Sequence, residues 1–118
     1  MSASDSVQIE RLVEDYFTGL HRADRALLDT VFDDRAQLQA PGIRRTKAEW
    51  LELVVSRPVP AERGDAFAYR LEAIDLFGEQ AVVRVYCPLL GREFVDFLSL
   101  LKEQGRWRIV NKMYADKP

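Results

Sequence analysis

Apolar side chains recur at helical spacing in the first half of the chain. Residues 5–20 carry one wide apolar stripe opposite a charged face, which predicts an amphipathic helix with Asp5 as its N-cap. Shorter stripes predict a second helix over residues 24–32, capped by Asp24, and a third over residues 46–55, which begins with a Thr-x-x-Glu capping box. Two prolines end the third helix, and a loop follows.

The second half of the chain has strand-like patterns instead. A brief strand is predicted at residues 37–40, and a longer one over residues 67–76, where a shift of phase predicts a β-bulge. A further strand is predicted over residues 81–87. Two β-prone runs, residues 94–101 and 107–114, flank a glycine-containing polar turn and predict a hairpin. Helices followed by an antiparallel meander indicate an α+β fold.

The last strands have apolar residues on both faces. Three adjacent apolar pairs carry this pattern: Val82-Val83, Leu100-Leu101 and Ile109-Val110. In an antiparallel sheet, helices usually cover one face and the other face is exposed to water. An apolar outer face therefore needs another partner. We therefore predict a homodimer formed through the outer face of the sheet.

Composition and charge narrow the class of protein. The 118 residues, 47% apolar and 31% charged, predict one domain over residues 1–118 with a frayed, disordered tail at 1–4. The net charge of −2 and scattered basic residues argue against a nucleic-acid partner, and no apolar run is long enough to span a membrane. Because no signal peptide is visible and Cys87 stands alone, we expect a cytoplasmic protein. With His21 the single histidine, neither a metal site nor a cofactor is predicted.

Several local motifs resemble the nuclear transport factor 2-like superfamily, and within it the lumazine-binding-like branch. They lie at residues 16–24, 28–34, 45–50, 57–58, 97–101 and 105–109. The resemblance extends over residues 6–114 and implies a cone in which three N-terminal helices pack on a strongly curved, mixed or antiparallel sheet. Members of the superfamily hold a mostly apolar pocket at the open end of that cone, but they differ widely in function.

The resemblance also implies roles for individual residues. Tyr16 lies where ketosteroid isomerase carries an oxyanion-donating tyrosine, and Asp96 lies within about one residue of that enzyme's protonated aspartate. The catalytic base of that enzyme corresponds to Ala40, which cannot transfer a proton. Asn111 occupies a position that faces the cone in many relatives. An amide orients a ligand but is a poor acid or base, so this pattern favours binding over catalysis.

The residues themselves leave alternatives open. Asp96, a carboxylate within an apolar strand, predicts either a pocket residue or an ion pair with Arg84 on the neighbouring strand. Tyr16 fits either the pocket or the core. Cys87 is interpreted as a buried apolar residue rather than a nucleophile, and His21 as a surface residue at a helix end. Three more aromatic residues are candidates for the pocket wall or for the core: Phe32, Trp50 and Tyr86.

Three functions stay open at this point. The first is a domain that binds an unknown small hydrophobic or aromatic molecule, with Tyr16, Asp96 and Asn111 as its polar contacts. The second is a cofactor-free cyclase, isomerase or dehydratase, in which Asp96, kept protonated by burial, transfers the proton. The third is an adaptor or structural dimerisation domain. We expect the first.

Overall fold

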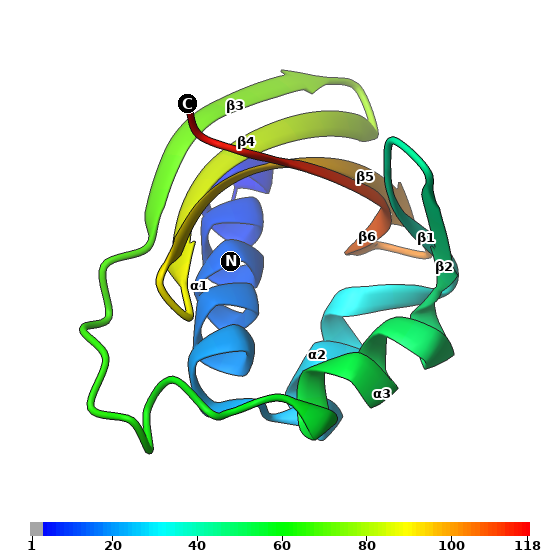
Figure 1. Cartoon of the computed structure of the whole chain (residues 1–118). Helices are drawn as coiled ribbons and strands as arrows, with labels where there is room; N and C mark the ends of the chain where they lie inside the picture. The colour runs from blue at the N-terminus through cyan, green and yellow to red at the C-terminus, as the bar shows by residue number, and fades with distance from the viewer. Residues whose placement is uncertain (1–3) are drawn as a thin grey trace.

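In the computed structural model, which describes residues 4–118, three helices pack beneath a curved six-stranded sheet (Figure 1). The elements follow the order α1 (Asp5–Arg22), α2 (Arg25–Val31), β1 (Phe32–Ala40), β2 (Ile43–Thr46), α3 (Lys47–Ser56), β3 (Arg70–Phe77), β4 (Gln80–Leu89), β5 (Arg92–Glu103) and β6 (Arg106–Asp116). The predicted α+β cone is confirmed.

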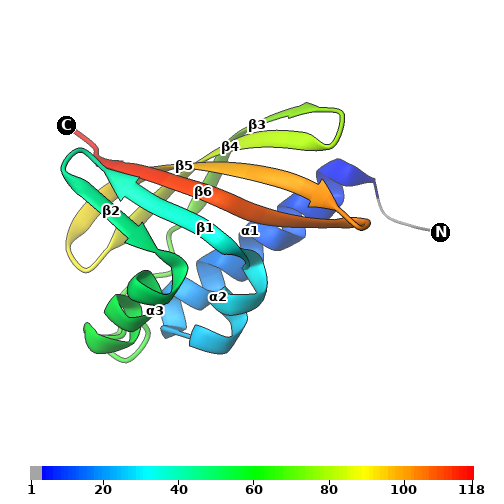
Figure 2. The ribbon, with the colours of Figure 1, turned by 90° about the vertical axis from the view of Figure 1, so that its right-hand side faces the viewer.

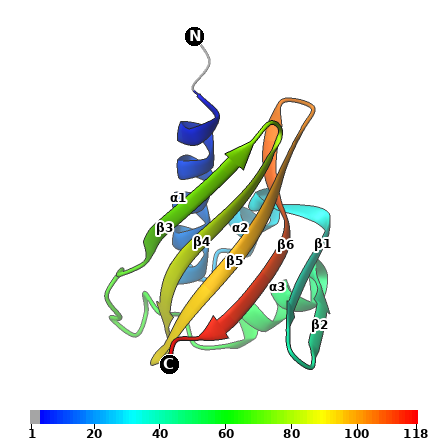
Figure 3. The same cartoon turned by 90° about the horizontal axis from the view of Figure 1, so that it is seen from above.

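The strand order across the sheet is β2-β1-β6-β5-β4-β3. Strands β3 to β6 form an antiparallel meander, whereas β1 lies parallel to β6, so the sheet is mixed. Figure 3 shows these strands from above, with β5 and β6 near the middle of the sheet. The predicted hairpin is therefore central, and its residues reach both the cavity and the outer face.

The helix starts follow the sequence, with one correction. Asp24 caps α2 by accepting from the Leu27 amide at 3.1 Å, and the predicted capping box opens α3. Ser4, not Asp5, caps α1 by accepting from the Val7 amide at 3.3 Å. The side chain of Asp5 is drawn away because it accepts hydrogen bonds from both Lys102 and Trp107. The tail was predicted at residues 1–4. Ser4 of this tail is described and forms the cap, and residues 1–3 lie outside the described residues.

Two boundaries near α3 differ from the prediction. Strand β1 begins directly after α2 and is longer than the predicted strand at residues 37–40. Strand β2 was missed because its polar sequence, Ile43–Thr46, resembles an exposed helix start; its stability comes from antiparallel pairing with β1. Val55, predicted in the apolar stripe of α3, is 44% exposed, so that stripe ends with Val54.

All three helices lie on one side of the sheet (Figure 2). The inner, concave face carries the buried core, while Val82, Phe97 and Met113 on the other face stay between 38% and 52% exposed. Hence the two faces of the central strands are both apolar, as predicted. Dimerisation through the outer face remains a prediction. None of the helices in the described part of the chain is long and apolar enough to cross a membrane.

The pairing register shifts at three places in the described sheet, and at two of them a single extra residue forms a bulge that changes which side chains face inward. The pairing of β3 with β4 shifts between Leu71 and Ala73, close to the predicted phase shift. The second bulge is on β6, where Ser99 pairs with Asn111 but the next residue, Leu100, pairs with Ile109. The extra residue between these partners is Val110. Beyond it, the alternation of β6 is reversed.

Candidate functional site

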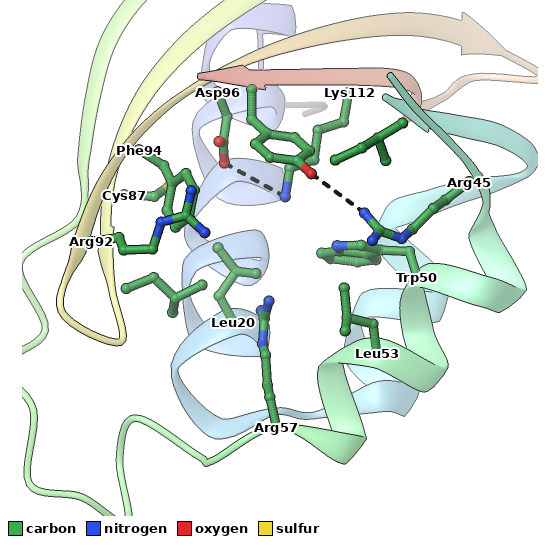
Figure 4. A pocket seen from close by; sticks show the side chains of 13 residues that line it. Leu20, Arg45, Trp50, Leu53, Arg57, Cys87, Arg92, Phe94, Asp96 and Lys112 are labelled. Carbon is green, nitrogen blue, oxygen red and sulfur yellow. Dashed lines mark hydrogen bonds and ion pairs between the residues drawn. The ribbon is translucent and has the colours of Figure 1, made fainter. Parts of the chain in front are cut away.

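A cavity of about 240 Å³ opens between the concave face of the sheet and helices α1 and α3 (Figure 4). Its apolar walls come from both layers: Leu20 on α1, Trp50 and Leu53 on α3, and Leu89 and Phe94 from the β4–β5 hairpin. Ligand pockets commonly enclose about 300–1,000 Å³. This cavity is therefore suited to a molecule smaller than a drug-sized ligand.

Asp96 points from β5 into this cavity and is only 2% exposed. One of its oxygens, Oδ2, accepts a hydrogen bond from the Tyr16 hydroxyl at 2.7 Å. Tyr16, on α1, is fully buried. This burial is the main reason that the pKa of Tyr16 lies well above its ordinary value, and the nearby Asp96 charge is the second. The phenol therefore stays protonated and acts as a fixed donor to the carboxylate.

Lys112 enters the same space from β6 and is 7% exposed. Its ammonium nitrogen lies 3.8 Å from Asp96 Oδ2, and 4.6 Å from the ring centroid of Trp50. The rings of Tyr16 and Tyr114 lie at 5.4 and 5.6 Å. Desolvation lowers the pKa of Lys112, and the Asp96 charge opposes that effect. The aromatic faces stabilise the cation without using its N–H donors.

Three arginines also line the cavity. Arg45 on β2 donates a long hydrogen bond, 3.4 Å, to the Tyr114 hydroxyl. Arg57 follows the last residue of α3 and extends toward the cavity (Figure 4); burial lowers the pKa of its guanidinium. Arg92 instead forms a two-bond pair with Asp116, at 3.0 and 2.6 Å. The cavity is thus cationic as well as apolar.

Cys87 lies in the cavity wall beside Asp96 and is buried. Burial, followed by the Asp96 charge, raises the pKa of the thiol far above its ordinary value. The protonated thiol is a poor nucleophile, which agrees with its interpretation as a buried apolar residue. No group of three or more metal-ligating side chains with suitable geometry occurs within residues 4–118.

The structure brings together only part of the predicted site. Trp50 and Asp96 line the cavity. Tyr16 lies behind Asp96 as its hydrogen-bond donor, and Phe32 packs behind Trp50 with ring centroids 5.0 Å apart, in the fully buried core. His21 is half-buried rather than on the surface, and its Nδ1 lies 2.9 Å from the Tyr69 hydroxyl.

Two predicted positions on the concave face are wrong. Asn111 lies on the outer face, where its side-chain oxygen accepts from Gln39 Nε2 at 2.6 Å, because the bulge on β6 reverses the alternation there. Tyr86 also faces outward and donates to Glu93 at 2.5 Å. The alternative ion pair of Asp96 is wrong as well. Arg84 points to the outer face and pairs with Glu72 at 3.5 Å.

Sequence reasoning missed the cationic residues of the site. Strand alternation correctly places Lys112 and Asn111 on opposite faces of the sheet. However, Asn111 was expected on the concave face, and the structure places Lys112 there. Arg45 occurs in the short basic run Arg44-Arg45-Thr46-Lys47, and Arg57 occurs in the motif at residues 57–58; neither context indicates a cavity. The usable sign was Lys112 itself, a charge within the apolar run from Trp107 to Tyr114.

The comparisons agree with this architecture. A family model described as "Putative lumazine-binding" matches residues 4–115. A solved NTF2-like protein of unknown function from Silicibacter pomeroyi is 24% identical, with a TM-score of 0.80 and coverage of 99% of this chain and 100% of the other. Another, from Methylobacillus flagellatus, is 21% identical, with a TM-score of 0.81 and coverage of 100% and 96%.

A ketosteroid isomerase-like protein from Erwinia carotovora atroseptica is 20% identical, with a TM-score of 0.71 and coverage of 95% of this chain and 96% of the other. None of the curated proteins compared matches the sequence. At these identities the solved structures establish the fold, and the family model matches nearly the whole chain. The chain therefore belongs to the family described as "Putative lumazine-binding", and it has the fold of the NTF2-like proteins.

Proposed function

We propose that the protein binds a small molecule in the cavity of the cone. The supporting observation is a cavity of about 240 Å³ whose wall combines apolar side chains with convergent polar ones. Buried polar groups are costly unless they are paired, and a packed core would have avoided them. A ligand that contacts Asp96 and Lys112 while covering Trp50 would account for this combination.

Catalysis is the second candidate, and the buried Lys112 favours it. Burial lowers the pKa of Lys112, so its neutral amine, which can accept a proton, forms more readily than that of an exposed lysine. However, the Tyr16 hydroxyl already donates its hydrogen bond to Asp96. This phenol is therefore not free to stabilise an oxyanion, as the isomerase mechanism requires. Ala40, at the position of that enzyme's base, argues in the same direction. We therefore propose binding ahead of proton transfer.

A screen of small aromatic and aliphatic compounds tests the proposal, read by thermal shift and by amide chemical shifts in NMR. Lumazine belongs in the screen because the family description names it. The informative variant is Leu53→Trp, since Leu53 lines the cavity and the larger ring would fill it. Its matched control is Val55→Trp, on the same helix but 44% exposed and away from the cavity.

We expect compounds that shift the resonances of cavity residues in the wild type and in Val55→Trp, and lose binding in Leu53→Trp. If bound compounds perturb only other surfaces, or bind Leu53→Trp as tightly as the wild type, the cavity is not the binding site and the proposal fails.

A further inference from the structure

The walls of the cavity carry more positive than negative charge. Four cationic side chains line it, Arg45, Arg57, Arg92 and Lys112, against the single carboxylate of Asp96. The whole chain has a net charge of −2, so this local excess is not a property of the general surface. Charges in a partly enclosed space need counter-charges close by, because water screens them less there.

Two of these five groups are already satisfied within the protein. Arg92 forms its two-bond pair with Asp116. Asp96 accepts the hydrogen bond of Tyr16 and lies 3.8 Å from Lys112, which exceeds hydrogen-bond distance. One carboxylate therefore stands beside three cations: Arg45, Arg57 and Lys112.

A second buried lysine shows how a protein normally satisfies such a group. Lys47 is 5% exposed, and its ammonium has four oxygen atoms within 3.1 Å, two from backbone carbonyls and two from the carboxylates of Asp29 and Asp34. Lys112 is nearly as buried, yet within residues 4–118 its ammonium makes no hydrogen bond. Its nitrogen extends into the cavity, where its ion pair with Asp96 at 3.8 Å is the charged contact drawn (Figure 4).

Arg57 is the second cation of the cavity whose side chain makes no hydrogen bond within residues 4–118. Its side chain is half-buried and, in the described part of the chain, forms neither a hydrogen bond nor an ion pair. The planar guanidinium presents N–H donors that match the two oxygens of a carboxylate. Arg45 reaches the cavity from β2, where it donates the long hydrogen bond to the Tyr114 hydroxyl. These donors converge from β2, β6 and the end of α3.

We propose that the ligand of the cone is a small carboxylic acid with an apolar or aromatic body. Its carboxylate would be held by Arg57 and Lys112, assisted by Arg45, while Trp50 and Leu53 contact the body. This inference rests on the proposed function and deepens it, because it assigns the chemical class of the ligand. The cavity volume limits the body to about the size of one or two rings.

Matched pairs of acid and amide test the inference. Benzoate is compared with benzamide, and 1-naphthoate with 1-naphthamide. Binding is measured by calorimetry and NMR titration. An amide keeps the shape but loses the charge, so we expect each acid to bind at least about tenfold more tightly than its amide. Inorganic phosphate is included to separate a bare anion from a carboxylate with an apolar body, and we expect it to bind more weakly than both acids.

Two variants assign the preference to residues. Arg57→Gln and Lys112→Met should each weaken acid binding about tenfold or more and lower the acid-to-amide ratio toward one. Arg57→Gln is the primary variant, because the side chain is partly exposed and makes no hydrogen bond or ion pair within residues 4–118 whose loss would unfold the protein. Arg35→Gln is the control, since the Arg35 side chain is 90% exposed on β1; we expect its ratio to equal that of the wild type.

The failures of the two proposals are distinguishable. If amides or other neutral compounds bind in the cavity as tightly as the acids, the carboxylate inference is wrong but the binding function stands. The same conclusion follows if phosphate binds as tightly as the acids, or if Arg57→Gln keeps the wild-type ratio. If neither acids, amides nor any compound of the wider screen binds, both proposals are wrong.

Discussion

Replacing Tyr16 by phenylalanine removes a single hydroxyl and tests whether the Tyr16–Asp96 contact holds the two layers of the cone together. The hydroxyl donates to Asp96 at 2.7 Å in a fully buried setting, and it links α1 to β5. A hydrogen bond to a charged group contributes about 1.5–3 kcal/mol, and its loss leaves the carboxylate less satisfied. Phenylalanine keeps the ring that packs against Phe17 and Phe32, so the packing loss is small.

Urea unfolding followed by tryptophan fluorescence measures the effect. With an m-value of about 1.5 kcal/mol/M, a loss of ~2 kcal/mol lowers the midpoint by roughly 1.3 M. Tyr86→Phe is the matched control: its hydroxyl donates to Glu93 on the solvent side, so we expect a change below about 0.5 kcal/mol. A Tyr16→Phe protein as stable as the control would refute the reasoning. In an Asp96→Asn background the substitution should cost less, because the two residues are coupled.

Two further predictions concern packing and assembly. Gly19→Ala should destabilise the protein, because the new Cβ would lie 2.6 Å from atoms of Leu28 and overpacking costs about 1–3 kcal/mol. This cost should exceed the gain of about 1 kcal/mol from the higher helix propensity of alanine. In a Leu28→Ala background, urea unfolding should show the same substitution to be neutral or stabilising. We also propose that the outer face of the sheet joins two copies of the chain, so light scattering should give a dimer that Phe97→Glu converts to a monomer, while Phe77→Glu, at the β3–β4 turn, leaves it intact; a monomeric wild type at micromolar concentration would contradict this.

The elements that could be predicted from the sequence are those fixed by local chemistry. Capping residues and apolar stripes define the three helices, and the glycine turn defines the β5–β6 hairpin, because each depends on residues within one or two turns of chain. Strand β2 could not be predicted, since its polar residues are held by pairing with β1 rather than by their own preference. The predicted N-cap of α1 is wrong for a related reason: the Asp5 side chain bonds to Lys102 and Trp107, which are 97 and 102 residues away in sequence.

The site was half predictable. Asp96 could be identified because a carboxylate within an apolar strand requires a partner. The resemblance placed Tyr16 in the same site, but as a second donor to a ligand and not as the hydrogen-bond donor of Asp96. Arg45 and Arg57 could not be placed, because each occurs in an ordinary polar segment and acquires its meaning only when β2 and the end of α3 meet the cavity. The excess of positive charge in the cavity exists only in the folded chain. The net charge of the whole sequence, −2, does not reveal it.

The position of Lys112 shows how one inserted residue decides the chemistry of the cavity. Trp107 and Ile109 face inward, so a regular strand would place Asn111 inside and Lys112 outside. The extra Val110 reverses the order and exchanges an amide for an ammonium in the wall. An adjacent apolar pair such as Ile109-Val110 is equally consistent with a two-faced strand and with a bulge, and only the register against β5 distinguishes them. The ligand class inferred for the cone therefore depends on a backbone irregularity, not on a motif.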